Sequence, residues 1–249
     1  MKINTIKKNG KKYKIELEDG NTITTYDDLI LKYNILYKKE INNELINKIE
    51  NENIFYDAYN CTLSYISKKL RSLYEVQNFL NKFLISEEEK QNIITKLKEI
   101  KLINDKNFTE SFINDKINFT NYGPYKIKKE LEKYKIEDEL INKSFNKIDQ
   151  NIYYEKVKKI ISQKIKINKK YSGNVLKQKI TIELINLGYP NDIIYDVLNT
   201  INIKGNIDEI YNKLYQKLSK KYSGYELEKI IEQKLYSLGY NKTEIEEKK

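Results

Sequence analysis

The side chains that most often carry out chemistry in proteins are scarce in this chain of 249 residues. There is no histidine, which removes the commonest general base and metal ligand. The single cysteine, Cys61, has no histidine to activate its thiol, so we interpret it as a small buried side chain on a helix. No glycine-rich phosphate-binding loop and no nucleophile elbow are present. The sequence therefore indicates a non-enzymatic protein with no cofactor and no metal.

Lysines are the side chains that the sequence indicates as candidates for binding a partner. The net charge is +10, and most of the excess lies between residues 151 and 224, which hold 14 lysines against 6 carboxylates. On a helix near residues 151–170, with about 100° per residue, the lysines fall nearly opposite the apolar stripe of Tyr153, Val157 and Ile160. We therefore expect them to face away from the core, towards an acidic partner such as nucleic acid or an acidic protein groove.

We name the expected binding surface the basic face. The alternative interpretation is that these lysines are the ordinary solvated faces of lysine-rich helices. The concentration of charge in one stretch favours the binding interpretation. The basic face comprises Lys156, Lys159, Lys166, Lys170, Lys177, Lys213, Lys217, Lys220 and Lys221.

The start of the chain has the pattern of strands rather than helices. Asn9-Gly10 and Asp19-Gly20 are hairpin turn signals, because both pairs tolerate a positive φ. Apolar and polar residues alternate between and after these turns. The first thirty residues therefore predict a sheet of two or three strands, which is marginal alone and should pack on the helices that follow.

From about Lys38 the apolar spacing changes to three and four residues, which is typical of helices. The segments 72–75 and 86–89 carry the S-x-x-E pattern of a capping box. We interpret the glutamates of the second segment as helix-capping residues rather than as a metal cluster. Only 2 prolines and 8 glycines interrupt the chain, so long helices are expected.

The second half contains an internal repeat with an offset of 51 residues. The Tyr-Ser-Gly at 171–173 recurs at 222–224, and the Leu-Gly-Tyr at 187–189 recurs at 238–240. Gly188 and Gly239 stand where a helix would stop in the left-handed conformation. The tyrosines at these landmarks are expected to pack between repeats, with stacking on bases as the alternative.

These patterns predict a mainly α protein of tandem three-helix repeats, which form an elongated curved solenoid with a small N-terminal β unit. No window reaches the roughly 18 apolar residues of a membrane span, so a soluble, cytoplasmic protein without a membrane partner is expected. The predicted units are 1–57 (the β-rich unit with a connecting helix), 58–103, 104–149, 150–201 and 202–249.

Three stretches in this order, 63–80, 102–108 and 123–136, resemble the motifs of the RecX family. Their matching positions are Arg71, Ser72, Glu75, Asp105, Phe108 and Gly123. The chain departs from the family pattern at Lys101, where glycine is usual, at Thr109, where alanine is usual, and at Tyr134-Lys135, near the usual Lys-Gly. Arg71 is the only arginine, since lysine replaces most of the arginines of the family. The extra C-terminal repeat and the N-terminal β unit are similar to the long form from low-GC Gram-positive bacteria.

The resemblance implies a monomeric modulator of the RecA recombinase. Such a protein binds the RecA filament on single-stranded DNA, with double-stranded DNA as a further ligand, and alters filament assembly, strand exchange and ATPase activity. Its processes would be recombination, DNA repair and the SOS response. Two alternatives stay open: a helical repeat protein that binds nucleic acid without RecA, and a protein–protein scaffold.

Overall fold

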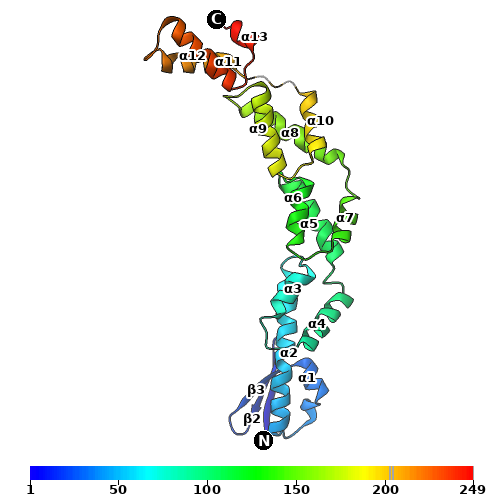
Figure 1. Ribbon diagram of the computed structural model, residues 1–249. Coiled ribbons are helices and arrows are strands. Elements are labelled where there is room, and N and C mark those ends of the chain that lie inside the picture. The colour runs from blue at the N-terminus through cyan, green and yellow to red at the C-terminus, as the bar shows by residue number, and fades with distance from the viewer. Residues whose placement is uncertain (202, 204, 249) are drawn as a thin grey trace. The chain divides into compact units, whose positions relative to one another are not determined.

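A three-stranded antiparallel sheet opens the chain in the computed structural model, which describes residues 1–201, 203 and 205–248 (Figure 1). The strands are β1 (Ile3–Asn9), β2 (Lys12–Leu17) and β3 (Thr22–Tyr26), in the order β1-β2-β3. Gly10 and Gly20 have φ values of 61° and 85° in the two hairpin turns. Both turn predictions and the predicted sheet are confirmed.

The sheet packs on the helices that follow it, as its size requires. One face of β2 buries Ile15 and Leu17 in a cluster that also holds Leu29 and Ile49. Leu29 belongs to α1 (Asp27–Lys32), which is followed by the 3-10 turn η1 (Ile35–Tyr37). The prediction of strands up to residue 30 was wrong at its end, because two aspartates open α1 where they favour a helix N-terminus.

Twelve further helices follow in the part of the chain that the structure describes, and the mainly α prediction is confirmed. The first, α2, has 25 residues and passes through residue 57, so the β unit and the next helices share it. Both capping boxes are formed, at Ser72 with Glu75 and at Ser86 with Glu89. The helices are α2 (Asn43–Ser67), α3 (Leu73–Leu80), α4 (Glu87–Glu99), α5 (Asp105–Phe119), α6 (Pro124–Glu132), α7 (Asp138–Phe145), α8 (Asn151–Ile167), α9 (Gly173–Asn186), α10 (Asn191–Thr200), α11 (Ile207–Leu218), α12 (Gly224–Ser237) and α13 (Lys242–Glu246).

The helices from α2 onward fall into four successive triplets, which begin at α2, α5, α8 and α11. Contacts divide the chain into two compact units, Met1–Phe108 and Thr109–Lys249. In the first unit, Val76 of α3 and Leu97 of α4 are fully buried against α2. Cys61 of α2 is exposed, so the expectation of a buried side chain was wrong. The thiol lies on the solvent side of α2, whose buried side carries Ala58 and Thr62.

In the second unit, the same backbone contact links one triplet to the next at two places. We call this contact the joint: the start of the second helix of one triplet meets the turn after the second helix of the next triplet. The Gly123 N–H donates to Leu187 O at 2.7 Å, so the start of α6 meets the turn after α9. One repeat later, the Ser172 N–H donates to Leu238 O at 2.9 Å, so the start of α9 meets the turn after α12. Within the described part of the chain, no helix is long and apolar enough to cross a membrane.

Candidate nucleic-acid interface

Helix α8 presents its lysines as the helical spacing predicts, with one exception. Tyr153 and Val157 are fully buried on its inner side. Lys159 and Lys166 are exposed on its outer side. Among the described residues, no carboxylate oxygen lies within 4.0 Å of either ammonium group. These two charges are therefore available to a partner.

The exception is Lys156, which the sequence placed on the exposed basic face. Its side chain is half-buried, and its ammonium donates to Thr120 O at 2.8 Å and also to Ile117 O. Both carbonyls belong to the C-terminal end of α5, where backbone acceptors lack helical partners. Burial, followed by the nearby charge of Lys159, lowers the pKa of Lys156. The expectation of an outward-facing Lys156 was wrong, because capping α5 holds the side chain inward.

The turn between α8 and α9 positions a second group of charges. The Asn168 side chain accepts from the Tyr171 N–H at 3.0 Å and donates to Tyr171 O at 2.6 Å, which fixes the turn. The ammonium of Lys170 lies 5.2 Å from the Tyr171 ring centroid, and that of Lys179 lies 4.4 Å from it. A half-buried aromatic ring thus lies close to two lysines. Lys179, which lies on α9, was not among the lysines predicted for the basic face.

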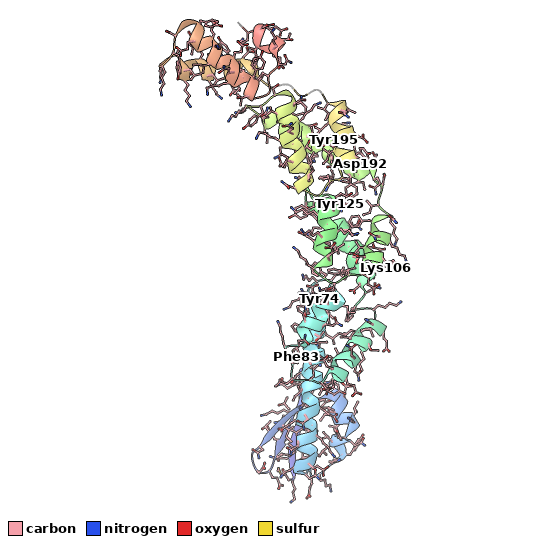
Figure 2. All side chains as sticks on the ribbon, in the orientation of Figure 1. Tyr74, Phe83, Lys106, Tyr125, Asp192 and Tyr195 are labelled. Carbon is pink, nitrogen blue, oxygen red and sulfur yellow. The ribbon has the colours of Figure 1, made fainter. Side chains whose placement is uncertain are left out.

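Lys177 is half-buried and points to a different feature, a groove of about 370 Å³ between α9 and α10. The exposed side chains of Ile182 and Tyr195 also line this groove. Figure 2 labels Tyr195 on α10, one turn after Asp192. Lys177 therefore borders a partly apolar groove, whereas Lys159 and Lys166 lie on the exposed side of α8.

The lysines of α11 are exposed, and one of them has an acidic partner. Lys213 pairs with Glu209 at 2.5 Å, whereas Lys217 and the residues at 220–221 have no carboxylate within 4.0 Å among the described residues. The hydrogen bond and charge of Lys213 lower the pKa of Glu209, and the charge of Lys169 lowers it further. Lys169, in the turn after α8, was not among the residues predicted for the basic face.

Three of the positions that carry the family resemblance, Arg71, Ser72 and Glu75, make contacts within the protein at the start of α3. The Arg71 guanidinium lies 3.9 Å from the Tyr65 ring centroid and donates to Glu75 at 2.8 Å. Tyr65 in turn stacks on Phe79, with ring centroids 4.2 Å apart. Ser72 and Glu75 form the capping box of α3. These contacts stabilise the start of α3 and leave little of Arg71 for a partner.

The remaining motif positions also serve packing. Asp105 accepts from the Leu73 N–H at 2.8 Å, and Phe108 is buried. A Cβ added at Gly123 would lie 2.5 Å from the Gly188 carbonyl carbon, so the joint between triplets requires glycine there. In the described structure, no group of three histidine, cysteine, aspartate or glutamate side chains is arranged to hold a metal ion.

Two of the departures from the family pattern have a common backbone geometry. Lys101 and Lys135 have φ values of 59° and 54°, in the left-handed region that favours glycine. Each stands at or near a position where glycine is usual in the family. The backbone conformation of these turns is therefore kept although the side chain has changed.

Comparison with known proteins decides the family. A family model described as "RecX, second three-helix domain" matches residues 104–144, which correspond to α5–α7. The "Regulatory protein RecX" of Streptococcus uberis is 30% identical over 99% of this chain and 97% of its own length. That of Streptococcus agalactiae serotype III is 32% identical over 98% and 97% of the two chains. The chain belongs to the RecX family.

Solved RecX structures share the fold. A crystal structure of a regulatory protein RecX matches with a TM-score of 0.65 and 20% identity, over 80% of this chain and 98% of that one. The crystal structure of RecX from Lactobacillus salivarius matches with a TM-score of 0.55 and 29% identity, over 59% and 96%. RecX relatives are named for regulation and for no reaction, which agrees with the expected non-enzymatic role.

Proposed function

We propose that this RecX protein modulates the RecA recombinase by binding the RecA filament on single-stranded DNA through the exposed lysines of the basic face. The observation that carries the proposal is similarity over the full length to proteins named "Regulatory protein RecX". The exposed lysines of α8 and α11 supply the charge that an assembly of DNA phosphate and acidic protein would recognise. Recombination, DNA repair and the SOS response are the processes in which such a modulator acts.

The mechanism is differential binding. A ligand shifts an equilibrium between filament states only by the difference in its affinity for them. A monomer that prefers one state, or that occupies a growing end, changes the filament at low stoichiometry without a chemical step. Free single-stranded DNA and double-stranded DNA present the same phosphates and are expected to bind more weakly than the filament.

The test is the single-stranded-DNA-dependent ATPase of the cognate RecA, with and without a few molecules of the protein per hundred RecA protomers. The expected result is a clear change in steady-state rate. The triple variant K159E/K166E/K170E should need at least tenfold more protein for the same change, because three exposed charges are reversed.

The matched control is K39E/K98E/K133E, which reverses three exposed lysines outside residues 151–224 and should act like the wild type. Lys156 is left unchanged, because it caps α5. No change in rate at equimolar protein and low salt would contradict the proposal and favour RecA-independent nucleic-acid binding. Equal activity of both triple variants would favour a scaffold that does not use the basic face.

A further inference from the structure

A hollow of about 370 Å³ lies where the end of α5 meets α8. Phe119, the last residue of α5, is 82% exposed at its edge. The ring takes little part in packing and is free to contact a partner. Neither the proposed function nor the basic face gives this residue a role.

The position of Phe119 is not a recurring packing position. Phe119 stands four residues before Gly123, the residue that precedes α6. The corresponding positions before α3, α9 and α12 hold Lys68, Asn168 and Ser219. A residue needed to join triplets would be expected to stay apolar in each of them, as the buried residues do. Counted back from the start of the next helix, Phe119 is therefore not part of the apolar packing that repeats between triplets.

The remaining walls of the hollow are polar and carry no negative charge. Three exposed amides, Asn118, Asn121 and Gln163, border it, together with the exposed ammonium of Lys159. The other apolar residue in the lining is Ile160, which is only 5% exposed. A protein partner that inserts an apolar anchor would find little further apolar surface here. Amides, by contrast, pair with base edges, and an aromatic ring stacks on any base.

The hollow is also held in shape before any ligand arrives. Lys156 donates from α8 to Thr120 O and Ile117 O, which fixes the end of α5 against α8. Its ammonium occupies carbonyl oxygens that would otherwise repel a phosphate. A site whose walls are positioned in advance loses less entropy on binding.

We infer that this hollow binds an unpaired nucleobase of single-stranded DNA, with the base stacked on Phe119, its edge facing the amides and a neighbouring phosphate on Lys159. The inference rests on the proposed function and adds to it a contact that duplex DNA cannot make, because paired bases are not free to enter. The protein would thereby sense single-stranded DNA by its bases as well as by its charge.

The experiment measures binding of the full-length protein, without RecA, to a fluorescently labelled oligothymidylate and to an abasic oligonucleotide of the same length. The wild type should prefer the oligothymidylate. F119A should lose roughly 5- to 150-fold in affinity for it and bind both oligonucleotides alike. F119Y keeps the ring and should restore the preference. I167A is the matched control, because Ile167 is 65% exposed at the end of α8 and should have no effect.

Equal affinity of F119A and wild type for oligothymidylate would overturn the inference. So would a wild type that does not distinguish the abasic strand, or one that binds neither at low salt. Each of these results leaves the RecA ATPase test free to succeed, so base binding and filament modulation are judged separately. Because Phe119 is exposed, we expect F119A to fold like the wild type. Circular dichroism of the variant checks this.

Discussion

Two buried tyrosines define the interior of the third triplet. Tyr153 of α8 and Tyr189 after α9 are 0% and 2% exposed. Their hydroxyls have no hydrogen-bond partner in the described part of the chain. Burial raises the pKa of each phenol to about 12, and for Tyr153 the proximity of Tyr189 adds to the effect. A hydroxyl that is buried without a partner destabilises the fold relative to an apolar group of the same shape.

Replacing Tyr153 with phenylalanine should therefore raise the free energy of unfolding by about 1 kcal/mol at pH 7. The advantage over the wild type should grow above pH 10. There the unfolded wild-type tyrosine ionises while the buried one stays protonated, so the folded state binds more protons and stability falls as pH rises towards 12. Urea unfolding at pH 7 and at pH 10.5 measures both effects.

The control for this prediction is Y225F, because Tyr225 is 81% exposed and its hydroxyl is hydrated in both states. Y225F should change stability by less than about 0.5 kcal/mol. A Y153F protein that is less stable than the wild type would show that an interior water satisfies the hydroxyl.

At the scale of elements, the glycines of the joints hold the second unit together. Gly188 has a φ of 86°, and a Cβ there would lie 2.6 Å from the Lys126 Cβ. Gly224 has a φ of 58°, but among the described residues no atom lies within 4 Å of such a Cβ. Substitutions at Gly188 and Gly224 therefore distinguish the cost of a left-handed backbone alone, at Gly224, from that cost combined with close packing, at Gly188.

G188A should lower the free energy of unfolding by about 3 kcal/mol, because the methyl group opposes both the backbone conformation and the contact with α6. G224A should lower it by only about 1 kcal/mol, because the backbone conformation alone is disfavoured. Urea unfolding of the full-length variants measures both changes. Similar losses in the two variants would mean that the joint relaxes to admit a side chain.

Local patterns explain which elements were predictable. The hairpin turns, both capping boxes and the stops at Gly188 and Gly239 depend on residues a few positions apart, and the structure contains all of them. The contact of Gly123 with Gly188 joins residues 65 positions apart, and no local pattern reports it. Lys156 was misplaced for the same reason. Its spacing on α8 is that of an outward residue, but carbonyls of α5 hold it.

At the scale of the whole molecule, charge is distributed unevenly along the sequence. Of the net charge of +10, the stretch 151–224 supplies most, with 14 lysines and 6 carboxylates. Some of these lysines are paired, such as Lys164 with Glu183 and Lys213 with Glu209. The number of charges free for a partner is therefore smaller than the composition suggests.

The salt dependence of DNA binding measures how many lysines contact phosphate. Neutralising phosphates releases counterions, so the logarithm of affinity for single-stranded DNA should fall linearly with the logarithm of salt concentration, with a slope of about −0.7 per contact. K159Q/K166Q/K170Q should reduce the magnitude of the slope by roughly 2 if all three ammonium groups contact phosphate. F119A should weaken binding at every salt concentration while the slope stays the same, because phenylalanine carries no charge. Fluorescence titrations across a range of salt concentrations distinguish the two. An affinity that is independent of salt would exclude the basic face as the surface that meets DNA, whatever the effect of the protein on RecA.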